Sequence, residues 1–530
     1  MNLNQIRAVL IGNFTLVSIL SVLFFFYPNV LGEDLYYHLK LSLLIKNSGF
    51  SVIRDMNWFQ LTTWSLYPAD LSLGFHLLLI PFLSWFSPIV SIKILGIILI
   101  LLLTNIFYFM LASENVKYII FWLFLMLFVS TFFLYRLSIV RPFLISITFS
   151  LLIFYSIVKG QHRILALTCF LYPSFYTGWI QIFIILFFYL VSNLLLTRHI
   201  QNKRVILISI IFVLGGLILR PDFPNILILT YQQVFELLLL NFKGLDLNVG
   251  IGQRIADIYF FQDNIISILL FASTLLLNFF NFKYLADERK KITLLSLSFI
   301  TLFYFVWSLE SIRFIEYWIP FTILFAALSF TYFTEPSILG MHSSTRILSQ
   351  IPVSIRNSRF WKVLFGLLLI AISYHSPLYV LKSIKNSKPI TTFRVEAQWM
   401  EDNTDRGANI FITSWDSFSR LFYYNHHNRY TVGMDPVFFY LRDPDRFWLW
   451  RNITEHNCVS SEPVSECPDG MDDPVLIART IRSKFESDYI FTNNYSVYYP
   501  FVKMMATHPE IFHFIMSGDN SFLFSIDPDL

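Results

Sequence analysis

The stretch GEDLYYHLK at residues 32–40 follows directly on the first apolar segment of the chain. It brings the adjacent carboxylates of Glu33 and Asp34 to the end of an expected membrane span, together with a histidine and a lysine. Ionisable groups at such a boundary cost free energy unless they are solvated, paired or used in function. Two interpretations follow. Either the acidic pair caps a helix that starts at Leu35, or Asp34 belongs to a functional site.

The composition of the whole chain is that of a membrane protein. Of its 530 residues, 55% are hydrophobic, only 14% are charged and 58 are phenylalanine, and the mean hydropathy is +0.59. Soluble domains carry about 25% charged residues, so this composition predicts a polytopic α-helical membrane protein. The net charge of +4 is small for this length, which gives no argument for binding nucleic acid.

A helical membrane span needs about 20 apolar residues, and ten segments are candidates. They are residues 8–30, 92–112, 118–135, 143–158, 179–196, 205–219, 265–282, 292–308, 313–333 and 361–381. Two shorter apolar stretches, 73–86 and 164–172, are ambiguous. Basic loops at 198–204, 283–291 and 346–362 favour the cytoplasmic side. With these loops and the N-terminus inside and the C-terminal part outside, we expect an odd number of about eleven spans.

This topology gives the membrane part, residues 1–382, two extracytoplasmic segments. The first outer loop, residues 31–74, and the residues just behind it contain Asp34, Tyr37, His38, Lys40, Asp70 and His76. Tryptophan and tyrosine in this loop suit helices at the membrane surface, but that preference does not explain the carboxylates and histidines. The second outer segment, residues 220–264, begins with Arg220 and two prolines that force an extended turn.

Two further arginines are candidate anion ligands. Glu310, Arg313 and Glu316 are spaced by three, which on one continuous helix places them on one face. There they form an ion pair, or Arg313 binds a phosphate, because guanidinium groups match phosphate oxygens. The side on which Arg141 lies depends on which ambiguous stretch crosses the membrane.

From residue 383 to 530 the composition changes to that of a soluble α/β domain. Helical and strand patterns alternate, with helices at 391–403, 417–424 and 475–485 and strands at 409–413, 429–432 and 488–492, before two final strands that meet at Asp519. This alternation predicts a small layered sheet. Asp416 is positioned to cap the helix at 417–424. Cys458 and Cys467 suit a small disulfide loop if this domain lies outside the cytoplasm.

Together these features resemble the GT-C superfamily of membrane glycosyltransferases, which includes oligosaccharyltransferases and protein O-mannosyltransferases. Asp34 followed by Tyr37-His38-Leu39 is similar to the Asp-x-x-Tyr-His-Leu opening of the oligosaccharyltransferase-like branch, and YPADLSLGFHLLL at 67–79 is similar to the later part of the same loop. The segment TSWD at 413–416 is similar to the Trp-Trp-Asp acceptor motif of that branch. It lacks the second tryptophan and the following Tyr-Gly, so recognition of a peptide sequon is not expected.

The resemblance implies an inverting transfer of a sugar from a polyprenyl-phosphate or polyprenyl-diphosphate donor to a glycan, lipid or protein acceptor. The expected place is the outer face of a bacterial inner or plasma membrane, among its lipids. Asp34, with Glu33 as the weaker partner, takes the acceptor proton or orients the acceptor. Substrate contacts are implied for Tyr37, His38, Lys40, Asp70, His76, Arg141, Arg220, Arg313, Trp415 and Asp416.

A divalent cation, Mg²⁺ or Mn²⁺, is implied by the oligosaccharyltransferase branch but not by the mannosyltransferase branch. Asp34 and Asp70 are its candidate ligands. His76 has a structural alternative as a hydrogen-bonded core histidine, and Trp415 has one as a strand-end aromatic.

Other activities stay open at this point. One is a lipid-linked oligosaccharide polymerase or ligase, and another is a transporter or flippase of lipid-linked sugars. A transporter places ionisable residues deep inside its spans, whereas here the polar residues concentrate in the outer loops, which favours chemistry at the membrane surface. A non-catalytic envelope assembly protein would leave Asp34 replaceable.

Overall fold

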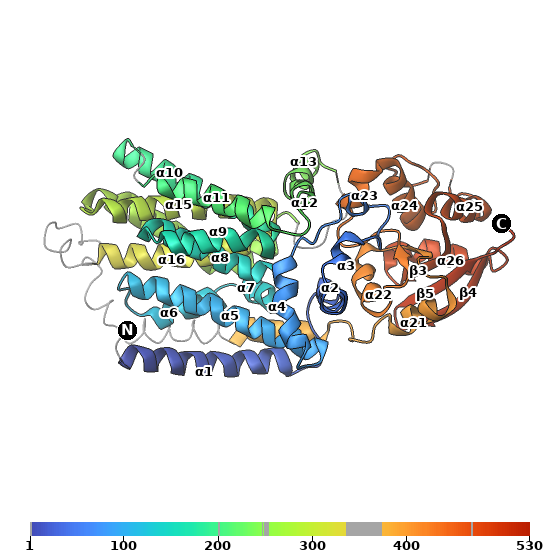
Figure 1. Ribbon diagram of the computed structural model, residues 1–530, viewed down its shortest axis with the longest axis horizontal. Helices are drawn as coiled ribbons and strands as arrows, with labels where there is room; N and C mark the ends of the chain where they lie inside the picture. The colour runs from blue at the N-terminus through green and yellow to red at the C-terminus, as the bar shows by residue number, and fades with distance from the viewer. Residues whose placement is uncertain (1–2, 200–201, 246, 248–253, 335–373, 468–469) are drawn as a thin grey trace. The chain divides into compact units, whose positions relative to one another are not determined.

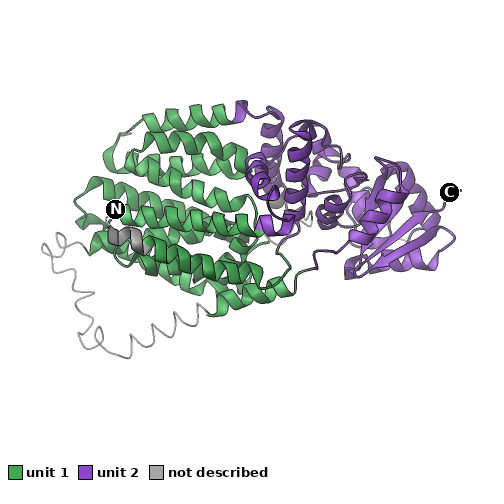
Figure 2. Ribbon diagram, turned by 60° about the horizontal axis from the view of Figure 1, so that its bottom comes forward, with its two compact units in different colours: residues 1–31, 93–216, 250–387 green, residues 32–92, 217–249, 388–530 purple. Residues whose placement is uncertain are grey.

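The computed structural model describes residues 3–199, 202–245, 247, 254–334, 374–467 and 470–530. Most of these residues are helical, and a five-stranded sheet lies in the C-terminal part (Figure 1). The chain forms two compact units, each assembled from separate stretches of sequence (Figure 2). Unit 1 comprises residues 1–31, 93–216 and 250–387, and unit 2 comprises residues 32–92, 217–249 and 388–530. The expected first outer loop is therefore part of the same unit as the C-terminal sheet.

Unit 1 is built from apolar helices that run side by side (Figure 2). Their bounds are α1 (Leu3–Phe25), α5 (Pro88–Ser113), α6 (Ile119–Phe128), α7 (Thr131–Ser138), α8 (Phe143–Lys159), α9 (His162–Phe175), η2 (Thr177–Ile180), α10 (Gln181–Thr197), α11 (Arg204–Ile218), α14 (Ile258–Asn281), η5 (Phe282–Tyr284), α15 (Glu288–Glu310), η6 (Ile312–Phe314) and α16 (Ile315–Phe333). The first residues of α5 and the last residues of α11 belong to unit 2. Among the helices long enough to span a membrane, α16 is the most deeply buried.

Within the described residues, five helical segments are long and apolar enough to cross a membrane, and the bent pair α6 and α7 makes a sixth if it is one span. The five are Pro88–Ser113, Thr177–Thr197, Ile258–Tyr284, Glu288–Glu310 and Ile312–Phe333. The apolar helices Phe143–Lys159 and Arg204–Ile218 are shorter than this requirement, and so is the part of α1 from Val9 to Phe25. Much of the expected span at 361–381, like the basic loop at 346–362, lies outside the described residues. The class of integral membrane protein is confirmed, but the expected number of eleven spans is not.

The expected span at 118–135 is not one straight helix. α6 ends at Phe128 and α7 begins at Thr131, and the two helices are bent by 80° at the break. Between them, Ser130 has extended backbone angles, and its side chain accepts a hydrogen bond from the backbone N–H of Phe133. A serine cap thus begins a new helix inside a continuous apolar run.

The two ambiguous apolar stretches form short helices. Residues 73–86 contain α4 (Leu73–Leu83), a helix of 11 residues in unit 2. At 1.5 Å per residue it is about 16 Å long, which is too short for a hydrocarbon core of about 30 Å. Residues 164–172 lie within α9 of unit 1, which has 14 residues.

Unit 2 joins three sequence segments. The first contains α2 (Asp34–Ser48), α3 (Ser51–Arg54), η1 (Thr63–Ser65) and α4, and the second contains α12 (Asn225–Tyr231), the π-helical turn η3 (Gln232–Glu236) and α13 (Leu237–Phe242). The third contains the helices α21 (Arg394–Asn403), η8 (Trp415–Ser417), α22 (Phe418–Tyr424), α23 (Val437–Arg442), α24 (Pro444–His456), α25 (Pro474–Phe485), η9 (Ser496–Tyr498) and α26 (Tyr499–Thr507). α2 packs against both α4 and α22.

The sheet of unit 2 has the strand order β2-β1-β3-β5-β4. Its strands are β1 (Asn409–Ile412), β2 (Arg429–Tyr430), β3 (Ser487–Asn493), β4 (Phe512–Gly518) and β5 (Ser521–Ile526). β1 pairs parallel with β2 and β3, and β5 pairs antiparallel with β3 and β4. The apolar residues of β1 are fully buried, as is typical of parallel strands covered on both faces. The expected α/β alternation and the final pair of strands are confirmed.

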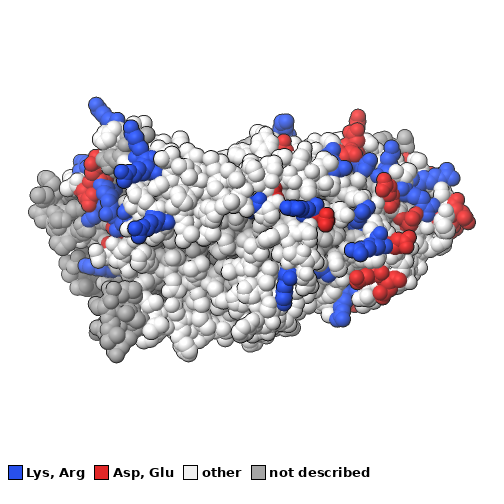
Figure 3. All heavy atoms as spheres, viewed as in Figure 1, with Lys and Arg blue, Asp and Glu red and all other residues white. Residues whose placement is uncertain are grey.

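Charged side chains are unevenly distributed within each unit (Figure 3). On the face shown, those of unit 1 gather at one end of its helices, and the surface along the helices is uncharged. The sheet-containing part of unit 2 displays both signs of charge. The uncharged surface of unit 1 suits contact with lipid hydrocarbon, because a charge exposed to hydrocarbon is costly.

Candidate functional site

The structure places most of the predicted site residues in unit 2. These are Glu33, Asp34, Tyr37, His38, Lys40, Asp70, His76, Arg220, Trp415 and Asp416. Arg141 and Arg313 belong to unit 1. The predicted site residues therefore form two groups, one in each unit.

Asp34 is the first residue of α2, and Glu33 precedes it at the N-cap position. The side chain of Asp34 is partly exposed, and a carboxylate at this end of a helix is favoured by the helix dipole. The side chain of Glu33 makes no capping hydrogen bond, so the capping interpretation is wrong for Glu33. Its carboxylate forms an ion pair with Arg420 of α22 instead, because a buried guanidinium requires a charged partner.

Arg420 ties the start of α2 to α22. It is 1% exposed and binds the Glu33 carboxylate through Nε. Its Nη1 donates to the Pro389 carbonyl at 2.6 Å, and its guanidinium carbon lies 4.2 Å from the centre of the Tyr36 ring. Charge-assisted hydrogen bonds and cation–π contacts of this kind are among the stronger polar interactions in proteins. The position of Asp34 thus depends on a residue almost 400 positions away in sequence.

A second series of polar contacts leads from Glu33 to Asp416. Lys388 Nζ lies 4.0 Å from Glu33 Oε1 and donates a hydrogen bond of 2.7 Å to the Tyr495 hydroxyl. That hydroxyl in turn donates to Asp416 Oδ2 at 2.8 Å. The network connects the acidic pair of the first outer loop with the segment that resembles the acceptor motif.

The sequence predicted that Asp416 caps α22, but the structure shows that it does not. The N-cap position is Ser417, which makes no side-chain capping bond. The Oδ1 atom of Asp416 accepts hydrogen bonds from Ser414 Oγ at 2.5 Å and from Asn493 Nδ2 at 3.4 Å. Side-chain donors at the ends of β1 and β3 therefore hold this carboxylate.

A buried chain of hydrogen bonds links His38, His76 and Asp70. His38 Nδ1 lies 2.7 Å from His76 Nε2, and His76 Nδ1 lies 2.6 Å from Asp70 Oδ2. Because a carboxylate oxygen accepts hydrogen bonds, His76 donates from Nδ1 to Asp70 Oδ2, and its other ring nitrogen shares a hydrogen bond with His38. Burial, with a smaller electrostatic contribution from the neighbouring His76, holds the pKa of His38 well below its usual range. His38 is thus a neutral ring at physiological pH.

Arg220 and Asp222 hold Asp70 from the second outer segment. Asp222 Oδ2 accepts the backbone N–H of Asp70 at 2.9 Å. Arg220 donates from Nε to Asp222 Oδ1 at 2.8 Å and from Nη2 to Asp222 Oδ2 at 2.7 Å, and it also binds the Asp70 carbonyl. Arg220 therefore joins two distant segments of unit 2, and its role as a substrate ligand stays a prediction.

Tyr37 and Lys40 occupy two different environments on α2. Tyr37 is 3% exposed and packs between the rings of Trp64 and Phe422. Lys40 is partly buried, and this burial lowers the pKa of its amine, against the opposing effect of Glu401. The substrate contacts expected of both residues stay predictions.

In unit 1, three arginines act on one glutamate. Arg136 of α7 donates from Nε to Glu316 Oε1 at 2.6 Å, and Arg141 and Arg313 also interact electrostatically with Glu316. The expectation of one helical face for Glu310, Arg313 and Glu316 is wrong, because α15 ends at Glu310 and Arg313 lies in the separate turn η6. The partner of Glu316 comes instead from α7. The group carries more positive than negative charge.

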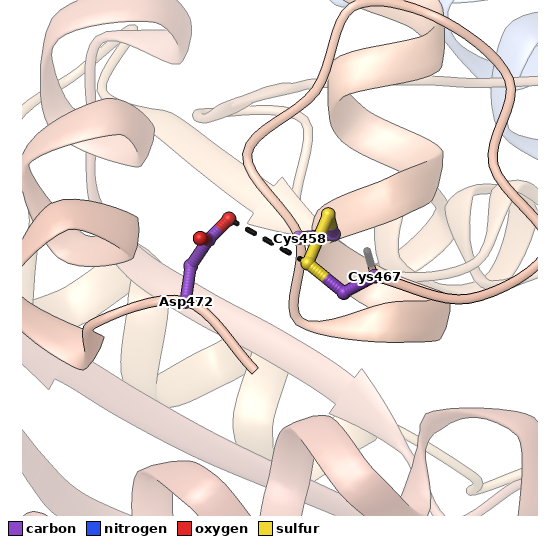
Figure 4. Close-up of side chains that lie close together, drawn as sticks. All are labelled: Cys458, Cys467 and Asp472. Atoms are coloured by element: carbon purple, nitrogen blue, oxygen red, sulfur yellow. Dashed lines mark hydrogen bonds between the residues drawn. A yellow bond between two sulfur atoms is a disulfide. The ribbon is translucent and has the colours of Figure 1, made fainter. Parts of the chain in front are cut away.

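Among the described residues, one cluster has the composition of a metal site, namely Cys458, Cys467 and Asp472 (Figure 4). The two cysteines form a disulfide, as expected, and bonded sulfurs are not the thiolates that bind metals.

The expected cation ligands are Asp34 and Asp70. Asp70 already accepts hydrogen bonds at both oxygens, from the Ser72 backbone and from His76, so it does not fit Mg²⁺ or Mn²⁺ well. Cation binding at Asp34 stays a prediction.

Sequence reasoning missed Arg420, Lys388 and Tyr495. The signal for Arg420 was a single arginine within the aromatic segment FSRLFYY at 418–424, where a buried charge needs a partner. Lys388 and Tyr495 carry no comparable signal, because lysine and tyrosine are common on the surface of such a domain.

No family model and no curated protein matches the sequence. Solved structures of an oligosaccharyltransferase from Archaeoglobus fulgidus do match, each at 13% identity. The TM-score is 0.57 for its apo form, 0.58 for the form tethered to an acceptor peptide with the NVT sequon, and 0.59 for AglB in complex with an inhibitory peptide and a dolichol-phosphate. The match covers 98–99% of this chain and 74–75% of the other. The chain thus has the fold of these oligosaccharyltransferase structures.

Proposed function

We propose that this protein is a membrane glycosyltransferase that moves a sugar from a polyprenyl-phosphate-linked donor to a glycan, lipid or protein acceptor on the outer face of the membrane. The observation that carries the proposal is the likeness to oligosaccharyltransferase structures over 98–99% of the chain. One of those structures holds a dolichol-phosphate, which supports a lipid-linked donor here.

Asp34 is the proposed base. In an inverting transfer, its carboxylate takes the proton of the acceptor group as the acceptor atom forms a bond to the anomeric carbon of the sugar. The bond between that carbon and the phosphate oxygen breaks, and the lipid phosphate leaves with the electron pair. Asp34 suits this step because it is partly exposed at a helix N-terminus, where the dipole favours the ionised carboxylate.

The leaving phosphate requires positive charge. We assign Arg141 and Arg313 to it, because they belong to a group in which three arginines act on the single carboxylate of Glu316. Guanidinium groups match phosphate oxygens in geometry and keep their charge at all physiological pH values. Asp416 is assigned to the acceptor side through the network that leads from it to Glu33. Trp415 is assigned with it because the two residues are adjacent in η8.

The proposal is tested in cells that lack the protein and are complemented with variants of it. We expect Asp34→Asn to accumulate the same lipid-linked sugar as cells without the protein, because loss of a general base lowers rates by about 10²–10⁴-fold. Asp55→Asn is the matched control, since Asp55 is an exposed carboxylate of the same loop. Lipid extracts are compared by mass spectrometry at equal protein levels. Normal lipid-linked sugar levels with Asp34→Asn would show that the proposed role of Asp34 is wrong.

A further inference from the structure

The second outer segment carries an apolar stripe that is exposed among the residues that the structure describes. Leu227, Tyr231, Phe235 and Leu239 are between 38% and 53% exposed. They recur every four residues along α12, η3 and α13, which form one continuous helical segment. The opposite side of this segment, which includes Leu229, is buried within unit 2.

The π-helical turn reduces the winding of this stripe around the helix axis. In a regular α-helix, side chains four residues apart drift around the axis by about 40° per step, so four of them would wind away from one face. A π turn has more residues per turn because its hydrogen bonds run from i to i+5. The turn Gln232–Glu236 lies between Tyr231 and Leu237, at the middle of the stripe, and it offsets part of that drift.

The stripe follows closely in sequence on a helix whose exposed side chains are largely apolar. On α11, the exposed large side chains include Leu207, Ile211, Leu214 and Ile218, which are 50–61% exposed. α11 ends at Ile218 and α12 begins at Asn225. The six intervening residues span about 20 Å at most. The chain therefore keeps the start of α12 close to the end of α11, a helix whose exposed apolar side chains suit lipid hydrocarbon.

We infer that the segment from α12 to α13 lies in the outer membrane surface, with Leu227, Tyr231, Phe235 and Leu239 inserted among the lipids of the bilayer. An amphipathic helix in this position buries its apolar face roughly 5–10 Å into the boundary between headgroups and acyl chains. On its buried side, Gln232 Oε1 accepts a hydrogen bond of 2.7 Å from Thr63 Oγ1 of the first outer loop. The segment thus ties the loop that begins with Asp34 to the membrane surface.

The inference is tested on the full chain in vesicles of phosphatidylethanolamine and phosphatidylglycerol. Single cysteines at the four stripe positions carry an environment-sensitive fluorophore, and lipids carry nitroxide quenchers near the headgroup or near the bilayer centre. The native disulfide and the buried Cys169 stay in place. We expect the shallow quencher to act most strongly at all four positions. Leu476→Cys is the control, because Leu476 is 47% exposed on α25 in the sheet-containing part of unit 2.

Three outcomes would overturn the inference. Quenching by aqueous iodide to the same extent as at Leu476 would mean that water covers the stripe. Strongest quenching from the bilayer centre would mean that the segment spans the membrane. Insensitivity to both lipid quenchers, with crosslinks between stripe cysteines of two molecules, would mean that a second copy of the chain covers it.

Discussion

Substitution of Arg420 by alanine removes the guanidinium that joins α2 to α22. The variant leaves the Glu33 carboxylate with only the more distant Lys388 amine, at 4.0 Å, as a cationic partner. It also removes the Arg420 donor to the Pro389 carbonyl and the contact with the Tyr36 ring. Because Arg420 is buried, no water replaces these contacts without repacking. We expect unit 2 to lose stability and the start of α2 to lose its fixed position.

The expected magnitude follows from these contacts. Breaking a buried ion pair by removing one partner costs about 3–5 kcal/mol, but the Glu33 side chain is 27% exposed and water recovers part of that cost. We therefore expect the free energy of unfolding of unit 2 to fall by about 3 kcal/mol, including the lost hydrogen bond at Pro389. For a folded unit of roughly 150–250 residues this corresponds to a melting temperature lower by about 6–12 °C.

The assay is thermal unfolding of the full chain in detergent, followed by intrinsic fluorescence. Arg482→Ala is the matched control, because Arg482 pairs with Asp488, whose side chain is 61% exposed, and such surface pairs contribute about 1 kcal/mol or less. Equal melting temperatures for Arg420→Ala and Arg482→Ala would refute the assignment of Arg420 as the link between α2 and α22.

Two further predictions concern protons and thiols. Because burial lowers the pKa of His38 from 6.5, the unfolded chain binds more protons than the folded one below about pH 6.5. The melting temperature of unit 2 should therefore stay constant above that pH and fall as the pH drops below it. The fall should be shallower in His38→Gln, which lacks the titrating ring. An equal fall in the wild type and in His38→Gln would contradict the prediction. The denatured, unreduced protein should show one free thiol, that of Cys169, and three after reduction, because Cys458 and Cys467 are bonded. Their replacement by serine should lower the free energy of unfolding by about 2.5 kcal/mol, and three free thiols before reduction would contradict the disulfide.

Local patterns predicted the sheet-containing part of unit 2 well. Its strands are short apolar runs bounded by polar turns, and amphipathic helices separate them. The period of the hydrophobic pattern therefore distinguishes strands from helices. Apolar composition predicted the membrane part less precisely. A run such as 118–135 is apolar over most of its length. The break between its two helices depends on the cap formed by Ser130, and a hydropathy profile does not reveal a cap.

For the candidate site, too, the sequence predicted some features and missed others. His38, His76 and Asp70 were selected from sequence as separate substrate ligands, and the structure joins them in one buried chain of hydrogen bonds. The pairing of Glu33 with Arg420 was not predicted, because it joins residues far apart in sequence. Contacts of that kind depend on how distant segments pack, and no spacing rule within the chain describes them.

The central claim is that this protein transfers a sugar and that Asp34 is required for the transfer. The most direct measurement incubates the purified full chain in vesicles with a lipid extract that holds the lipid-linked sugar of cells lacking the protein, together with an extract of their acceptors. We predict that the wild type releases the lipid phosphate and attaches the sugar to an acceptor, and that Asp34→Asn does neither while Asp55→Asn does both. Movement of the intact lipid-linked sugar between leaflets without cleavage of the sugar–phosphate bond would contradict the claim.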